Sequence, residues 1–384
     1  MFESIYILSL PVEIIILIIE DLPKADLWNL YNGCQTLRAY SAPYLFRTVR
    51  IRFSGAIPVL LNSRQFPFPQ NRLLRILAKW AVHVREMDVW GDEESIQLEF
   101  LNLLPHLENL TTFSVSYPPS ATAFQMLLVQ LATMPSLRTM NVDFMSPKTW
   151  ALPMSFRSLR NLYLSCIGHE PGISVLPALP ALETLALNFW CYCLDCPRNG
   201  QEPCTMLQLD QLPRLLALSI SGAQEGNIIC GGISPQLREL EISFSRGFSL
   251  NMILASLGPS LEEVYICECE FPLEKPLSGQ PYPAMRRLSI LNSASGLAAF
   301  VSFELPPTLR LVMRIKGDDF EHLRGWPQVV KFFRSHAVEL SLSGPVDTEG
   351  LLGQTCRLLE VMSLPSVRRD GPNWPQPSNV QPGD

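Results

Sequence analysis

The sequence predicts an α/β protein in which a small unit of three helices precedes a solenoid of parallel strands, with helices or turns returning between the strands. Three observations lead to this prediction. A short apolar phrase recurs along most of the 384-residue chain, a proline recurs at a set distance before it, and the amino-terminal residues carry helical patterns instead. The chain is therefore expected to divide into a helical unit and a repeat array.

The recurring phrase is an apolar residue, two variable residues, a second apolar residue, one variable residue and a third apolar residue, as in 159–164 and 182–187. Its copies begin at Val84, Leu110, Leu137, Leu159, Leu182, Leu215, Leu237, Leu261, Met285, Leu309, Ala337 and Leu359. All but one of the gaps between copies are 22 to 28 residues long, within the range of about 20 to 29 that is typical of leucine-rich repeats. The spacing therefore predicts a leucine-rich-repeat solenoid.

A recurring proline has the same period as the apolar phrase. A proline stands two residues before the first apolar residue of seven copies, where its fixed φ ends any preceding helix. These prolines are Pro135, Pro180, Pro213, Pro235, Pro259, Pro283 and Pro307. Between copies, apolar residues in 124–131 and 250–257 keep the spacing of a helix, so the return segments are expected to be partly helical. The phrase is weak near Leu309 and Leu359, and the repeat boundaries stay open there.

In such a solenoid the parallel strands line the concave face and the helices or turns line the convex face. The variable positions of the phrase then point to the concave side, which is expected to bind a substrate protein. The expected contact residues are Tyr163, Glu239, Glu241, Glu263, Tyr265 and Arg287. The three glutamates favour a basic partner segment, unless Arg287 neutralises Glu263 in a structural ion pair. The alternative is a solvated face, with the substrate bound at an end of the array or by its loops.

The amino-terminal stretch carries the helical patterns. A helix is expected to begin near Pro11, because the first turn needs no N–H there, and 14–19 are six consecutive apolar residues. Such a helix presents apolar surface in every direction and must be covered all round. Two further helices are expected, at 24–31 and, cut at Pro43, at 37–45. A unit this small cannot cover the first helix alone, so a partner is expected.

This stretch resembles the F-box family, whose pattern of Leu-Pro, Glu-Ile, spaced aliphatic residues, Asp-Leu, Cys and Leu-Arg can be followed along it. The matching residues are Leu10, Pro11, Glu13, Ile14, Ile18, Leu22, Asp26, Leu27, Leu30, Cys34, Leu37 and Arg38. The segment 43–49 that follows resembles the tail of fungal members. The match departs at Gly33, where the family usually carries Val and where glycine weakens the local helix.

The resemblance implies that the helical unit docks on the Skp-type adaptor of a cullin ubiquitin ligase. The residues expected to face the adaptor are Leu10, Pro11, Ile14, Ile18, Leu22 and Leu27. The array resembles the leucine-rich repeats joined to F-boxes in many fungal proteins, although the Asn or Cys expected after the phrase is found only as Cys269. The alternative is an apolar helical cap that closes the end of the array.

These patterns predict four parts of the chain: the F-box at 1–50, a junction at 51–83, the repeat array at 84–364 and a disordered proline-rich tail at 365–384. The alternating strand pattern around Val49 leads into the junction. Within the junction, this strand is expected to be followed by a loop with two prolines and then by an amphipathic helix. The junction is therefore expected to join the helical unit to the array without a free linker.

Composition disfavours several classes of partner. The formal net charge is −6, so no basic field attracts nucleic acid or anionic lipid. No run reaches the length of a membrane-spanning helix, and the apolar amino terminus carries Glu3 and lacks the basic start of a signal peptide. We therefore expect a cytoplasmic or nuclear protein whose ten cysteines are mostly reduced thiols.

Four cysteines gather in the longest gap between copies, at Cys191, Cys193, Cys196 and Cys204. Cys193 and Cys196 have the spacing of zinc ligands, but no second paired motif follows, so reduced thiols are the preferred interpretation over zinc. The sequence lacks phosphate-binding, nucleophile-elbow and metalloprotease motifs, so neither an enzyme nor a cofactor is expected. Two functions remain: the substrate-recognition subunit of a ubiquitin ligase, and a repeat scaffold outside any ligase.

Overall fold

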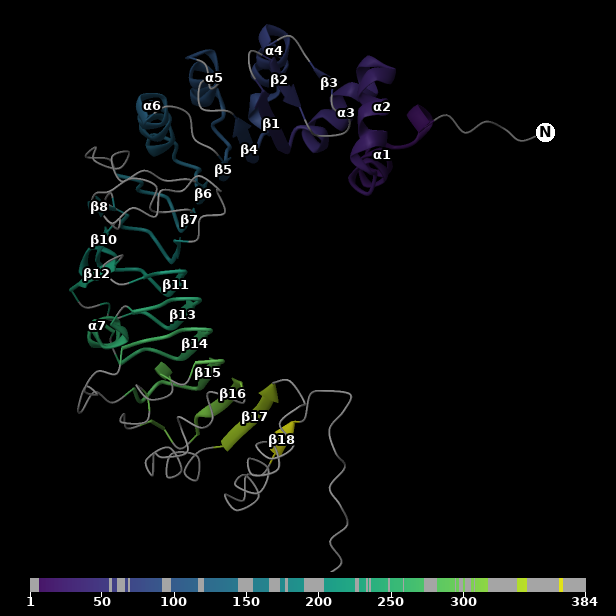
Figure 1. Cartoon of the computed structure of the whole chain (residues 1–384). Coiled ribbons are helices and arrows are strands. Elements are labelled where there is room, and N and C mark those ends of the chain that lie inside the picture. The colour runs from purple at the N-terminus through teal and green to yellow at the C-terminus, as the bar shows by residue number, and fades with distance from the viewer. Residues whose placement is uncertain are drawn as a thin grey trace, which may run out of the picture. The chain divides into compact units, whose positions relative to one another are not determined.

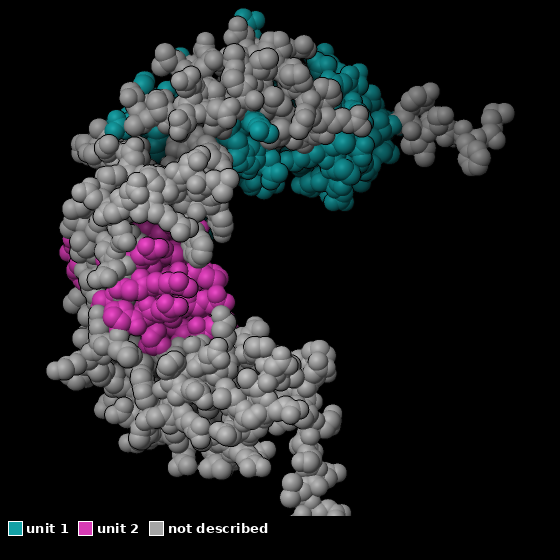
Figure 2. All heavy atoms as spheres, in the orientation of Figure 1, with its two compact units in different colours: residues 1–182, 191–203 teal, residues 183–190, 204–384 magenta. Residues whose placement is uncertain are grey.

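A computed structural model of the chain describes residues 7–54, 57–60, 66–67, 70–91, 98–116, 121–143, 155–165, 173–176, 179–189, 204–224, 228–232, 234, 236–247, 249–257, 259–272, 282–293, 295–296, 300, 305–306, 308–316, 337–343 and 366–368. Figure 1 shows their helices and strands. The chain forms two compact units, coloured in Figure 2: unit 1 is Met1–Leu182 with Cys191–Pro203, and unit 2 is Glu183–Trp190 with Cys204–Asp384. Each unit contains parallel strands joined by returning segments, the arrangement of a solenoid-like repeat.

Unit 1 begins with the three helices that the sequence predicts. Its first elements are the 3-10 turn η1 (Ile7–Ser9) and the helices α1 (Val12–Glu20), α2 (Lys24–Gly33) and α3 (Gln35–Leu45). Pro11 and Pro23 supply the extended residues that precede α1 and α2, and Cys34 Sγ accepts a hydrogen bond from the Leu37 N–H at the start of α3. Pro43 lies inside α3, contrary to the expected cut, because its missing N–H affects only the last turn.

Five strands of unit 1 run parallel in the order β7-β6-β5-β4-β1. They are β1 (Thr48–Ser54), β4 (Glu86–Gly91), β5 (Thr112–Ser116), β6 (Thr139–Asp143) and β7 (Asn161–Ser165). Buried and less buried residues alternate along them: in β1, Val49 and Ile51 are buried, whereas Arg50 and Arg52 are exposed. One side of each strand therefore forms the core. The expected boundary at residue 50 falls inside β1, which already pairs with the first repeat strand.

The proline-containing stretch that follows β1 is not a plain loop. It contains β2 (Ile57–Leu60), which pairs antiparallel with β1, and β3 (Phe66–Pro67), which pairs antiparallel with β2. These two strands are not predicted from the sequence, because an antiparallel pair has no counterpart in the repeat phrase. The amphipathic helix expected next is confirmed as α4 (Gln70–Trp80).

The remaining elements of unit 1 are return segments. They are the 3-10 turns η2 (Ala81–His83) and η3 (Leu104–His106), the helices α5 (Leu98–Leu103) and α6 (Ala121–Ala132), and the strand β8 (Ile173–Val175). The helical spacing predicted for 124–131 is confirmed in α6, whose residues Phe124, Leu127, Leu128 and Leu131 are each at most 1% exposed. Return segments therefore pack on the buried side of the strands.

Unit 2 repeats the parallel arrangement in the order β18-β17-β16-β15-β14-β13-β11-β9. Its strands are β9 (Thr184–Asn188), β11 (Ala217–Ser221), β13 (Glu239–Ser243), β14 (Glu263–Cys267), β15 (Arg287–Leu291), β16 (Arg310–Lys316), β17 (Ala337–Ser343) and β18 (Ser366–Arg368). Its return segments are β10 (Cys204–Gln208), which pairs with β12 (Ile228–Gly231), the turn η5 (Leu209–Gln211) and the predicted helix α7 (Leu250–Ala255). Leu250, Ile253 and Leu254 of α7 are buried.

The end of the array differs from the sequence-based boundaries. β16 begins one residue after Leu309 and β17 begins at Ala337 itself, whereas the strands of the earlier copies begin two residues after the first apolar residue. Leu359 lies outside the described residues. β18 pairs with β17, so the sheet extends past residue 364 into the stretch that was expected to be a disordered tail.

Strands β11, β13, β14 and β15 each end in the same kind of turn. The second residue after the last buried apolar residue has a left-handed backbone, with φ of 70° at Gly222, 52° at Phe244, 51° at Glu268 and 52° at Asn292. The N–H groups of the first three donate to carbonyls of the next strand at 2.8 to 2.9 Å. Each turn is therefore tied to the repeat that follows it.

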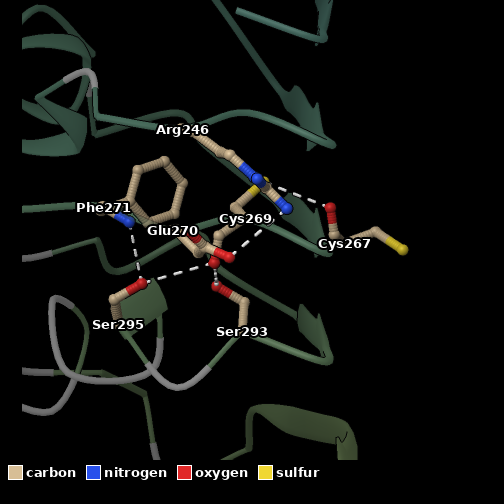
Figure 3. A network of polar contacts seen from close by, with 7 residues as sticks. All are labelled: Arg246, Cys267, Cys269, Glu270, Phe271, Ser293 and Ser295. Atoms are coloured by element: carbon tan, nitrogen blue, oxygen red, sulfur yellow. Dashed lines mark hydrogen bonds and ion pairs between the residues drawn. The ribbon is translucent and has the colours of Figure 1, made fainter. Parts of the chain in front are cut away.

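The residue after the left-handed one is buried and forms a ladder of hydrogen bonds. Cys269 Sγ donates to the Cys267 carbonyl at 3.2 Å, and Ser293 Oγ donates to the Cys269 carbonyl at 2.7 Å (Figure 3). Ser245 fills the same position in the preceding repeat. From the sequence this position is recognised only at Cys269, because Asn or Cys is the residue expected there. Ser245 and Ser293 occupy it in the neighbouring repeats, where a serine hydroxyl satisfies the same buried groups.

Candidate interaction surfaces

Helix α1 leaves most of its apolar side chains in solvent. Only Ile15 and Ile19, at i and i+4, turn inward, with 3% and 0% exposure. The exposed fractions of the others are 39% for Val12, 43% for Ile14, 36% for Ile16, 58% for Leu17 and 37% for Ile18. These five residues are called the α1 surface below. So many exposed apolar side chains on one short helix make it a candidate interaction site.

Five of the six residues predicted to face an adaptor are accessible. Pro11, Ile14 and Ile18 are exposed, and their spacing of three and four residues places them on one face of the helix; Leu10 and Leu22 are half-buried at its two ends. The sixth, Leu27, needs correction. It is only 4% exposed, so it packs inside the helical unit and offers no contact to a partner.

Aromatic side chains fasten the three helices to the first repeat of unit 1. Tyr31 of α2 meets Phe46 edge-on at 5.5 Å and Trp80 edge-on at 6.1 Å between ring centroids. Trp80 also stacks on Phe46, and its Nε1–H donates to the Tyr31 hydroxyl at 2.9 Å. The Arg38 guanidinium lies 5.3 Å from the Tyr31 ring centroid, and its Nε–H donates to the Tyr31 carbonyl. The helices are therefore held at a defined place beside β1 and α4.

The second predicted site lies on the exposed side of unit 2. Glu239, Glu241 and Glu263 are exposed, and the strand register places Glu239 opposite Glu263 and Glu241 opposite Tyr265. Neighbouring strands are about 4.8 Å apart, so the Glu239 and Glu263 carboxylates repel each other. The predicted acidic cluster is therefore brought together by the fold.

Tyr265 is the aromatic group of this surface. Partial burial, the hydrogen bond with the Cys267 side chain and the nearby carboxylates of Glu241 and Glu268 raise the pKa of Tyr265 to about 12. The phenol is therefore neutral at physiological pH and can donate a hydrogen bond.

Arg287 stands beside Glu263, as expected, but the two do not form the predicted alternative ion pair. The register pairs them directly, yet no ion pair within 4.0 Å joins these two described residues, and Arg287 Nε–H donates to Ser289 Oγ at 3.2 Å. The residues that immediately precede Glu239, Glu263 and Arg287 do form ion pairs. The Glu262 carboxylate lies 3.7 Å from the Arg238 guanidinium and 3.6 Å from that of Arg286. Glu262 therefore forms two ion pairs within the fold, whereas none within 4.0 Å joins Glu263 to Arg287.

Tyr163, the remaining predicted contact, belongs to β7 of unit 1 and is 41% exposed. Its partner across the sheet is Asn141, whose Nδ2–H donates to Ser114 Oγ at 3.0 Å. Ser116 Oγ likewise donates to Asp143 at 2.6 Å. On β5 to β7, this side of unit 1 therefore carries small polar groups that are hydrogen-bonded across the strands, and Tyr163 projects beside them.

Sequence reasoning missed Arg310. β16 begins at this residue and the register places it opposite Arg287, so it continues the row that starts at Glu239. Its side chain is exposed. The phrase is shifted by one residue at Leu309, and aligning the arginine with Arg287 would have required the register of the folded sheet.

The sequence predicts no metal site, and this prediction concerns the described residues and the four cysteines of 191–204 separately. Within the described residues, no group of three or more His, Cys, Asp and Glu side chains is arranged to hold a metal ion. Cys191, Cys193 and Cys196 lie outside the described residues, as does the side chain of Cys204, so the preference for reduced thiols over zinc stays a prediction. Among the described helices, none combines the length and the apolar character that crossing a membrane requires.

No protein-family model matches the chain, and no curated protein matches it either.

Proposed function

We propose that this protein is the substrate-recognition subunit of a Skp–cullin–F-box ubiquitin ligase. In this proposal the helical unit docks on the Skp-type adaptor, and the repeats hold a target protein so that a partner enzyme can modify it. The chain contributes proximity to a reaction that another protein catalyses. A cytoplasmic or nuclear location is part of the same proposal.

The exposed α1 surface is the observation that carries this proposal. Burying an aliphatic side chain contributes about 1.5–3 kcal/mol, so the five exposed residues represent a large unused binding energy. The aromatic cluster around Tyr31 and Trp80 holds the helices firmly while α1 faces outward. A partner that covers α1 therefore meets a preorganised surface.

The alternative is a repeat scaffold outside any ligase, in which the helices are a cap. The contacts of Tyr31, Phe46 and Trp80 suit a cap, because they pack the helices against the first repeat. The α1 surface does not suit it, because a cap presents a polar outer side to solvent. This difference favours the adaptor-binding function.

The test is capture of purified Skp-type adaptor, alone and with cullin, by the full chain. Replacing Ile14 and Ile18 together by serine should weaken capture at least about tenfold, because the exposed parts of two aliphatic side chains, 43% and 37%, can no longer be buried. Both residues are 37% or more exposed, so the fold should be unaffected in circular dichroism. Met126→Ser with Val129→Ser on α6 is the matched control, since these residues are 46% and 44% exposed in the same unit. Adaptor capture that is absent in the native chain, or equal in both double variants, would favour the scaffold.

A further inference from the structure

The turn that follows β13 carries a phenylalanine on a left-handed backbone. Phe244 has a φ of 52°, and the same turn position holds Gly222 after β11, Glu268 after β14 and Asn292 after β15. Glycine and asparagine adopt this backbone readily, whereas a bulky side chain there is strained. Glycine forms the turn after β11 with less strain, so the turn itself does not require a phenylalanine. Strained residues of this kind concentrate at functional sites.

Phe244 is also exposed. After all of its contacts within the chain, its side chain is 44% exposed, and no other large hydrophobic side chain among the described residues of unit 2 is as exposed. At the equivalent turn positions, Gly222 adds no side chain on one side, and Glu268 lies one strand spacing away on the other, about 4.8 Å. Phe244 therefore offers a partner an aromatic surface with a carboxylate beside it.

Three further groups gather beside Phe244. The Phe244 N–H donates to the Cys267 carbonyl at 2.8 Å, and the Tyr265 phenol is hydrogen-bonded with the Cys267 side chain. After burial and this hydrogen bond, the carboxylates of Glu241 and Glu268 also raise the pKa of the Tyr265 phenol, so both lie near it on the exposed side of the sheet. Glu241, Phe244, Tyr265 and Glu268 are referred to below as the Phe244 site.

The two carboxylates of the Phe244 site carry negative charge that the fold leaves unpaired. The Glu241 carboxylate accepts a hydrogen bond from Ser219 Oγ at 3.2 Å, and the Glu268 carboxylate accepts one from Asn292 Nδ2 at 3.4 Å. Both donors are neutral. Within the part of the chain that the structure describes, no ion pair within 4.0 Å involves either carboxylate.

Two arginines close to the site in the fold are bound to other groups. Arg246 follows Phe244 by two residues, and its guanidinium lies 3.6 Å from the Glu270 carboxylate. Arg287 lies on β15, next to β14, and its Nε–H donates to Ser289 Oγ at 3.2 Å. The negative charge of the Phe244 site is therefore complementary to a cation on a partner.

We propose that the Phe244 site binds an arginine side chain of a partner protein. A guanidinium is planar and always charged; it stacks on aromatic rings, and its fork of N–H donors matches a carboxylate. A lysine ammonium is a strongly hydrated point charge and lacks the planar surface, so it fits the site less well. The proposal rests on the proposed function, because the arginine would belong to the protein that is recruited.

The test measures binding of fluorescent peptides to the full-length protein, titrated to millimolar concentration. Three peptides share one Gly/Ser scaffold and differ at one central residue, which is arginine, lysine or citrulline; in citrulline a neutral urea group replaces the guanidinium. The native protein should bind the arginine peptide at least about tenfold more tightly than the citrulline peptide and about threefold more tightly than the lysine peptide. High salt should reduce the first preference. Binding of arginine that merely equals that of citrulline or of lysine, or no binding, would overturn the proposal.

Variants of the site locate the effect. Phe244→Leu removes the aromatic ring but keeps an apolar side chain on the same backbone, so arginine binding should weaken about two- to fivefold. Glu241→Gln with Glu268→Gln removes the charge at nearly unchanged shape, so the preference for arginine over citrulline should disappear. If this double variant does not fold by circular dichroism, each single glutamine variant should reduce the preference.

Unit 1 offers matched controls. Tyr163→Leu removes an exposed aromatic ring there, and Glu86→Gln with Glu108→Gln removes two exposed carboxylates. Both controls should bind the arginine peptide as the native chain does. An arginine preference that survives the changes at the Phe244 site, or that falls equally in the controls, would overturn the proposal.

Adaptor capture by the same variants separates this proposal from the proposed function. The Phe244 site belongs to unit 2 and the α1 surface to unit 1, so the variants of the site should capture adaptor as the native chain does. A native chain that prefers the arginine peptide but captures no adaptor would refute the ligase function alone. A chain that captures adaptor but shows no arginine preference would refute the Phe244 site alone.

Discussion

Replacing Ser245 by alanine should destabilise unit 2 by about 2–4 kcal/mol, because its buried hydroxyl holds two repeats together. Ser245 is fully buried; its Oγ–H donates to the Ser243 carbonyl at 2.9 Å, and its Oγ accepts from the Ala223 N–H at 3.1 Å. Losing the donated bond costs about 1 kcal/mol. Leaving the buried Ala223 N–H without a partner adds about 1–3 kcal/mol.

Urea unfolding of the full chain, read by circular dichroism, measures the loss of stability, and hydrogen exchange assigns it to the turn. The Ala223 amide should exchange faster in Ser245→Ala, since its acceptor is gone. Ser221→Ala is the matched control, because it makes the same chemical change on the exposed side of β11. Ser245→Cys should recover part of the loss, since Cys269 serves at the same position of the next repeat.

Free energies of unfolding that differ by less than about 0.5 kcal/mol between Ser245→Ala and Ser221→Ala would refute this role of Ser245, because surface substitutions ordinarily scatter by that much. Unchanged exchange of the Ala223 amide would contradict it independently. In either case the ladder, of which Figure 3 shows the part at Cys269 and Ser293, would be a consequence of the turn geometry and would not stabilise the repeats.

Two further predictions concern other parts of the fold. Burial raises the pKa of Cys269 from its ordinary value of 9.0 to about 11, so the folded form favours the neutral thiol and stability should fall as the pH rises from about 9 to about 11. Unfolding midpoints across this range test the fall, which Cys269→Ser should lessen, and native-state alkylation should label the less buried Cys267 before Cys269. Trp80→Leu should lower the free energy of unfolding of the helical unit by about 2 kcal/mol, because the hydrogen bond to Tyr31 and the stacking on Phe46 are lost. Faster hydrogen exchange in α2 with unchanged exchange in β5 and β6 would support this, and uniform exchange throughout unit 1 would contradict it.

Much of the repeat fold could be predicted from the sequence. The strands of the first nine copies begin two residues after the first apolar residue of the phrase, and α6 and α7 lie where helical spacing placed them. Alternating apolar residues specify a strand with one buried side, and a spacing of three and four specifies a helix. The same alternation identified the exposed positions, including the glutamates of β13 and β14.

The tertiary structure decided the features that depend on neighbours far along the chain. The contact of Tyr31 with Trp80 joins residues 49 positions apart, and it determines which side of the helical unit packs on the first repeat. The burial of Leu27 likewise follows from the packing of the helices and not from the local pattern. Arg310 joins the row of Arg287 only through the register of β15 and β16, since the local phrase is shifted by one residue there. Periodicity reports which side of an element is apolar, because that depends on the element's own residues. Which groups meet across the sheet depends on the pairing of whole strands, which no local pattern contains.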